Sequence, residues 1–138
     1  MIWQLQNFLL FLWITTAFTQ DTEPVKEYIY SIRSRAYFNE VLIDEFTVMI
    51  QTNESLTTFD IPEGLWSDLT EISSRLDLNK LKELETDSIK TAKDFSLRGK
   101  LRIQAGKTTF YSPDFPRGSP PEEIAQIVGL MEKFLISE

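Results

Sequence analysis

The 138-residue sequence contains neither cysteine nor histidine. Without histidine there is no imidazole general base, which excludes Ser-His-Asp and Cys-His catalysis and every histidine-containing zinc or iron site. Without cysteine there is no disulfide, thiolate nucleophile or Fe-S cluster, so an exported form of this chain depends on its hydrophobic core alone. The five glycines are scattered singly and form no phosphate-binding loop. The sequence therefore predicts no metal site and no cofactor.

Positive charge is also scarce, with 14 basic against 21 acidic side chains and a formal net charge of −7. The first 20 residues contain no charged side chain, so the whole net charge falls on the remainder. Binding to nucleic acid requires a concentrated basic face, and this acidic balance argues against it. The length fits one domain with a genuine core.

The amino terminus has the pattern of an export signal. An apolar run, FLLFLWI at 8–14, precedes a stretch of small residues that ends at Thr19. We expect residues 1–19 to form a signal peptide and residues 20–138 to form a single domain, with cleavage after Ala17 as the second choice. The leading MIWQLQN lacks a basic residue, so a retained membrane anchor is the alternative, although the run is short for a bilayer span. Either way the domain is predicted to be secreted or periplasmic, without stable membrane insertion after cleavage.

Alternating apolar and polar residues predict strands at 27–35, at 56–61 and, most clearly, at 96–105. The segment 41–51 is predicted to form two short strands separated at Asp44-Glu45, and Gly106-Lys107 is predicted to turn into a strand at 108–112. Helical spacing predicts a helix opening at Pro62, with Trp66 in its buried stripe, and a short helix capped by Asp77. A last helix is predicted after the cap Ser119.

Two segments, 48–73 and 101–128, share the order strand, polar turn, strand with Thr-Thr-Phe, and proline-opened helix. The order admits a duplicated ββα unit, with chance similarity as the alternative. The predicted fold class is α+β, an antiparallel sheet of four to five strands with helices packed on one face.

A basic stripe is the first candidate binding feature. Arg98, Lys100 and Arg102 alternate along one strand, and Arg33 and Arg35 extend the stripe if their strand is adjacent. The stripe is suited to an acidic partner, and cross-strand pairing with carboxylates is the alternative.

Acidic and aromatic loop residues are the second candidate. Asp94 and Asp114 flank the second hairpin and invite a carboxylate-pair hydrolase, although turns also require aspartate and proline. The loops at Tyr37-Phe38 and 114–118 complete the predicted binding surface. Its residues are Arg33, Arg35, Tyr37, Phe38, Arg98, Lys100, Arg102, Asp114 and Arg117.

Three segments, SRAYFNEVLI at 34–43, DLNKLKELE at 77–85 and KTTFYSPDFPRGSPPEEI at 107–124, resemble small exported proteins of flavobacteria and other Bacteroidetes that have no assigned activity. The pattern of that group ends in Phe-Asp-His-Gly-x-Pro-Pro-x-Glu-Ile; here Pro-Pro-Glu-Glu-Ile is kept and Asp-His is absent. This loss favours a structural role for the motif. The order of strands and helices is distantly similar to that of emfourin-type peptidase inhibitors, in architecture only.

The sequence thus predicts a non-enzymatic protein-binding module of the cell envelope or medium. Its expected partner is an envelope or secreted protein, and its oligomeric state is left open. A peptidase inhibitor is one alternative, and a carboxylate-based acid/base hydrolase is another.

Overall fold

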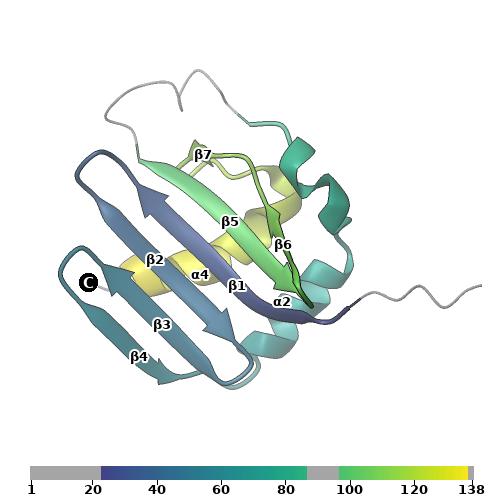
Figure 1. Cartoon of the computed structure of the whole chain (residues 1–138), viewed down its shortest axis with the longest axis horizontal. Helices are drawn as coiled ribbons and strands as arrows, with labels where there is room; N and C mark the ends of the chain where they lie inside the picture. The colour runs from purple at the N-terminus through teal and green to yellow at the C-terminus, as the bar shows by residue number, and fades with distance from the viewer. Residues whose placement is uncertain (1–22, 87–96, 137–138) are drawn as a thin grey trace, which may run out of the picture.

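The computed structural model describes residues 23–86 and 97–136, which form one antiparallel sheet and a layer of helices (Figure 1). Its elements in chain order are β1 (Val25–Arg33), β2 (Phe38–Asp44), β3 (Thr47–Thr52), β4 (Leu56–Asp60), α2 (Leu65–Ser74), the 3-10 helix η1 (Leu78–Glu83), β5 (Arg98–Ala105), β6 (Thr108–Tyr111), β7 (Phe115–Pro116), the 3-10 helix η2 (Glu122–Ile124) and α4 (Ala125–Ile136).

The strand order is β4-β3-β2-β1-β5-β6, and the short β7 pairs with β5 beside β6. Helices α2 and α4 lie behind the sheet in Figure 1. The prediction of an α+β fold is confirmed, but the predicted four to five strands were too few. Both halves of segment 41–51 join the sheet as β2 and β3, and β7 adds a seventh strand.

Strand alternation separates the two faces of the sheet. In β1, Tyr28, Tyr30 and Ile32 are fully buried, and in β5 Leu101 and Ile103 are buried on the same side. These side chains meet the apolar faces of α2 and α4 to form the core. The opposite face of the sheet carries most of the charged and polar residues of these strands, together with the apolar Ile29, Leu42 and Met49. The helices therefore cover the more apolar face.

Helix α2 is attached to β1 through Tyr28. The Tyr28 hydroxyl and the Ser73 hydroxyl are hydrogen-bonded at 2.7 Å, and the Trp66 ring packs edge-on against Tyr28 at 5.4 Å between centroids. Burial raises the pKa of the Tyr28 phenol, and the hydrogen bond to Ser73 offsets part of this shift. The prediction that Trp66 packs in the core is confirmed.

Two predicted helix starts were wrong. Helix α2 begins at Leu65 rather than Pro62, because Gly64 adopts a left-handed conformation with φ of 83° and ends a turn that Pro62 opens. Ser119 is not the cap of the last helix: its amide donates to the Pro116 carbonyl, and η2 then leads into α4. The Asp77 cap is confirmed, since its carboxylate accepts from the Asn79 amide at 3.1 Å.

Both segments of the predicted repeat form a hairpin followed by a helix. The two copies differ, however, because β7 and η2 intervene before α4 while α2 follows β4 after a short turn. Duplication stays a prediction. In the two described ranges, no helix is long and apolar enough to cross a membrane.

Asp44 organises the turn between β2 and β3. Its Oδ1 accepts hydrogen bonds from the amides of Phe46 and Thr47, at 2.8 and 2.7 Å, and from the Thr47 hydroxyl at 3.2 Å. Burial by itself raises the pKa of the Asp44 carboxyl, but these hydrogen bonds together outweigh it and leave the pKa lowered.

Replacing Asp44 by alanine is expected to lower the free energy of unfolding by about 1 kcal/mol at pH 7. Because the folded-state pKa lies below the unfolded value of 3.8, the contribution is complete above that value and is lost as pH falls through the folded-state pKa. Urea unfolding of wild type and Asp44→Ala at several pH values measures this. A difference that persisted in strong acid would contradict the role of the ionised carboxylate.

Candidate functional site

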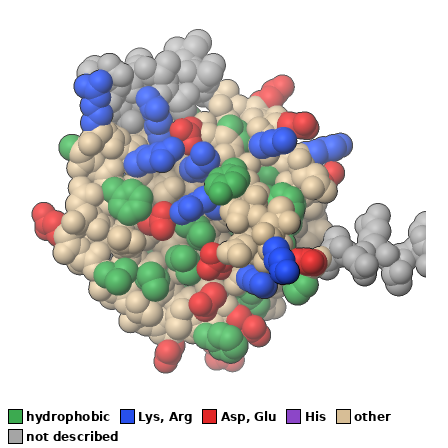
Figure 2. Space-filling view, viewed as in Figure 1, with side chains coloured by type: hydrophobic (Ala, Val, Ile, Leu, Met, Phe, Trp, Pro, Cys, Tyr) green, Lys and Arg blue, Asp and Glu red, His purple; other side chains and the backbone are tan. Residues whose placement is uncertain are grey.

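No described element covers the face of the sheet opposite α2 and α4, which we call the open face. It consists of the outward residues of β1, β2 and β5 and of their neighbours, and Figure 2 views the molecule from this side. Strand β1 lies at its centre, between β2 and β5. The adjacency of β1 and β5 decides where the predicted basic residues fall.

Four cations gather at one end of the open face, the basic end. Arg98, Lys100 and Arg102 alternate along β5, and Arg33 at the end of β1 lies directly opposite Arg98. Lys100 pairs with Ser31 and Arg102 with Ile29 in the same register. The structure therefore brings Arg33 together with the predicted stripe, while Arg35 is exposed in the following turn.

Two carboxylates contact this basic end. Glu40 on β2 accepts from Arg102 at 2.8 Å across β1, and Asp114 lies 3.6 Å from both Arg33 and Lys100. The predicted alternative of pairing with carboxylates is thus realised for Lys100 and Arg102. Four cations against two carboxylates leave a local excess of two positive charges, in a chain whose net charge is −7.

The other end of the open face is acidic. Glu27 on β1 lies opposite Asp44 on β2, and Asp60 on β4 occupies the same cross-strand row beyond Thr47. In Figure 2 most blue side chains lie in the upper part of this face and many red ones lie in the lower part, although some red groups occur at the upper right and some blue groups at the lower right. The register of the strands therefore gives the open face one end that is more positive and one end that is more negative.

Apolar side chains separate the two ends. Met49, Leu42 and Ile29 lie directly opposite one another on β3, β2 and β1, and the same row continues through Arg102 to Tyr111 on β6. Tyr111 is 48% exposed, and the Lys100 ammonium lies 5.6 Å from its ring centroid. This row combines the side-chain types that are enriched in protein interfaces.

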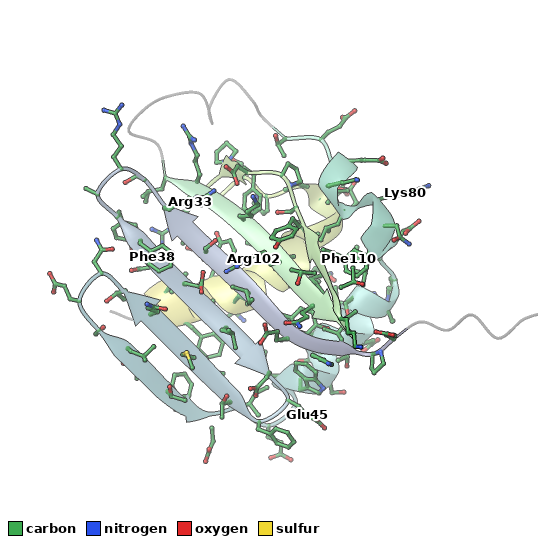
Figure 3. The ribbon with its side chains drawn as sticks, in the orientation of Figure 1. Arg33, Phe38, Glu45, Lys80, Arg102 and Phe110 are labelled. Carbon is green, nitrogen blue, oxygen red and sulfur yellow. The ribbon has the colours of Figure 1, made fainter. Side chains whose placement is uncertain are left out.

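Figure 3 labels three residues of the open face, with Arg33 and Arg102 over β1 and β5 and Phe38 over β2. Phe38 lies opposite Arg33 and is half-buried. Asp94, the proposed partner of Asp114 in a hydrolase, lies outside the described residues. Asp114 itself is engaged by two cations.

Two predicted binding residues, Tyr37 and Arg117, lie on the helix side of the sheet. Arg117 donates to Glu132 of α4 through Nε at 2.9 Å and Nη2 at 2.8 Å, and the Tyr37 hydroxyl accepts from Asn39. Burial by itself lowers the pKa of the Arg117 guanidinium. The Glu132 carboxylate and the neighbouring tyrosines raise this pKa by a larger amount, so the pKa is raised overall. These residues form an internal polar cluster rather than part of the open face.

Tyr30 contributes its hydroxyl to this polar cluster. The hydroxyl is buried and makes no hydrogen bond of good geometry with a described residue, although the Glu132 carboxylate is close. Burial, with the negative charge of Glu132 added, raises the pKa of the Tyr30 phenol far above its usual range. Asn39 and Glu132 are not among the binding residues that the sequence predicts. The signal for Glu132 was its position four residues after Val128, on the apolar face of the last helix.

A shallow groove of about 550 Å³ runs between α2 and α4 on the opposite side of the molecule. It is lined by charges of both signs around Ile72 and Leu130, and Glu71 there is paired with Arg75 at 2.9 Å.

Within 23–86 and 97–136, no group of three or more acidic side chains is placed to hold a metal ion.

No family model matches the chain, and comparisons with curated proteins and with solved structures found no match.

Proposed function

We propose that the protein is a non-enzymatic binding module that holds an acidic segment of a partner protein on its open face. One observation carries the proposal: an uncovered sheet face joins an apolar row to a basic end with two positive charges in excess. Within the row, Ile29 is only 7% exposed, whereas Leu42 and Met49 are half-buried and Tyr111 is exposed. Aromatic residues, methionine and arginine are the residue types enriched in interfaces.

The charges of the open face indicate the chemistry of the partner. Arg33 and Arg98 lie directly opposite each other, an arrangement that is unfavourable unless negative charge is nearby. Asp114 supplies part of that charge, at 3.6 Å from Arg33. Carboxylates of a partner would supply the rest, while the acidic end at Glu27 and Asp44 repels a uniformly anionic polymer.

The protein is proposed to act outside the cytoplasm and to act by binding rather than by catalysis. The predicted signal at 1–19 supports export, so we propose an envelope or secreted protein as the partner. The ion pairs of Asp114 with Arg33 and Lys100 support a structural role for this carboxylate rather than an acid/base role, and we propose no reaction.

A capture experiment tests the proposed function. The purified protein serves as bait for envelope and secreted fractions of its host, beside an open-face variant with Arg98, Lys100 and Arg102 changed to serine. The matched control changes Lys80, Lys82 and Lys133 to serine, because these three exposed lysines lie on η1 and α4, away from the open face. Both variants remove three positive charges, so they separate position from net charge.

We expect the wild type and the control to capture the same protein and the open-face variant to bind it about 100-fold more weakly, a loss of about 2.7 kcal/mol. Binding by the wild type should also weaken with added salt, because the basic end is partly exposed. Equal loss in both variants would attribute capture to net charge and contradict the proposal. Urea unfolding of each variant checks that the fold is intact.

A further inference from the structure

The two edges of the sheet differ in how they are protected. At one edge, η1 packs beside β6, and β7 pairs with the remainder of β5 (Figure 1). At the other edge, no described strand or helix pairs with the outer side of β4. An exposed strand edge presents unpaired amides and carbonyls, and proteins normally protect it with lysine, proline or a bulge.

Strand β4 contains no lysine, proline or bulge, and its one charged side chain, Asp60, lies at its end. Its sequence, LTTFD, is exposed throughout and contains β-branched and aromatic residues that favour extended structure. Leu56 is 62% exposed and Phe59 is 37% exposed. The register of β4 on β3 is continuous from Thr47↔Asp60 to Gln51↔Leu56, so no bulge interrupts the edge.

The hydrogen bonds at both ends of the β3–β4 hairpin show which backbone groups point outward. The Thr52 amide donates to the Ser55 carbonyl at 2.9 Å, and the Ile61 amide donates to the Phe46 carbonyl at 3.0 Å. Because paired residues alternate along an antiparallel ladder, Thr57 and Phe59 also direct their backbone groups toward β3. The amides and carbonyls of Leu56, Thr58 and Asp60 therefore face the free edge.

We propose that this edge pairs with β4 of a second copy of the chain, antiparallel and centred on Thr58. In this register Thr58 lies opposite Thr58 of the second copy, and Leu56 lies opposite Asp60. Each of these outward residues then donates and accepts one backbone hydrogen bond, so the three unpaired positions are all satisfied.

The side chains of β4 are complementary to themselves in this register. Thr57 lies beside Phe59 of the second copy, and Leu56 covers the stem of Asp60, so both exposed apolar side chains gain cover and no like charges are opposed. The Phe59 ring already lies 5.8 Å from Phe134 of α4, which extends the contact to the helix layer. An unrelated strand would lack this symmetry, which is why a second copy is the better occupant.

The two-fold axis of such a pair runs perpendicular to the sheet, so both open faces lie on the same side of one continuous sheet. The dimer would present two basic ends to one partner or to two. Its formation does not depend on the proposed function, because β4 lies at the edge and the basic end lies on β1 and β5.

The test uses the self-opposed position. Thr58→Lys and Thr58→Glu each place like charges opposite each other at the two-fold axis of the dimer. Within the monomer, each variant changes only one exposed side chain. Thr109→Lys is the matched control, since Thr109 is an open-face threonine on β6 at the protected edge. Sedimentation equilibrium of each protein, and of the two Thr58 variants mixed, measures the dimer dissociation constant.

We expect a concentration-dependent dimer of the wild type, weakened about tenfold by either Thr58 variant. Mixing the Thr58 variants should restore dimerisation, and Thr109→Lys should leave it unchanged. A chain that stays monomeric at every accessible concentration would overturn the proposal. So would a dimer that is insensitive to both Thr58 variants, or a mixture no tighter than either variant alone.

Discussion

Replacing Gly99 by alanine is expected to lower the free energy of unfolding by about 3 kcal/mol. A Cβ at this position would lie 2.5 Å from Cε2 and 2.9 Å from Cζ of Phe115. The Phe115 ring is fully buried and stacks on Tyr30 at 6.2 Å between centroids, so it cannot move aside without displacing the core. The added methyl group must therefore push β7 away from β5.

A double-mutant cycle separates this clash from a general loss of strand flexibility. Phe115→Leu removes the ring atoms that a Gly99 methyl would strike, and by itself is expected to cost about 1 kcal/mol. The double variant should be more stable than the sum of the single effects predicts, by at least about 1 kcal/mol. Additive effects in urea unfolding would contradict the clash.

Gly129→Ala is the matched control for this substitution. Gly129 lies within α4, and a Cβ there would meet nothing within 4 Å. Alanine favours the helix over glycine, so this variant is expected to raise the free energy of unfolding by about 0.5 to 1 kcal/mol. The same chemical change is thus expected to have opposite signs at two positions of one chain.

The second large effect is expected in the internal polar cluster. Glu132→Ala leaves the Arg117 guanidinium without its carboxylate partner. Because the Arg117 side chain is only 29% exposed, water replaces this partner incompletely. Removing one member of a buried pair is costly, and partial exposure places the expected loss at about 2 to 3 kcal/mol. Thermal or urea unfolding measures this loss.

Two further variants test the cause of that loss. Arg117→Met combined with Glu132→Leu should recover most of the stability, because it removes both charges and restores apolar packing. Glu71→Ala breaks the Arg75 pair on α2, whose side chains are about two-thirds exposed, and should change stability little. A double variant as unstable as Glu132→Ala would contradict the assignment to an uncompensated charge.

The sequence was sufficient to predict strands β1 to β6 but neither the short β7 nor the strand order. Alternation at 27–35 and 96–105 indicated correctly which side chains of β1 and β5 point into the core, because a half-buried strand repeats every second residue. It did not indicate that Ile29 and Ser31, on the opposite face of β1, are buried as well. Whether Arg33 joins Arg98 depends on β1 lying beside β5, a contact between distant segments. No local pattern encodes that contact, so the basic end became visible only in the fold.

The positions of Arg117 and Tyr37 on the helix side of the sheet could not be predicted from the sequence. Both lie in segments predicted to surround the binding surface, but the two-residue strand β7 places Phe115 and Arg117 on the helix side of the sheet. A strand this short has no periodicity to detect. The start of α2 was misplaced for a similar reason, since the left-handed turn at Gly64 overrides the signal of Pro62.

Site-specific photo-crosslinking in the host tests the central proposal, that the open face binds a partner, most directly. A benzophenone amino acid replaces Tyr111, which is exposed beside Lys100 and Arg102, or in a separate strain Glu71 in the groove between α2 and α4. We expect a specific protein adduct from position 111 that disappears when Arg98, Lys100 and Arg102 are changed to serine. An adduct formed only from position 71, or one at position 111 that survives the triple change, would contradict the proposal.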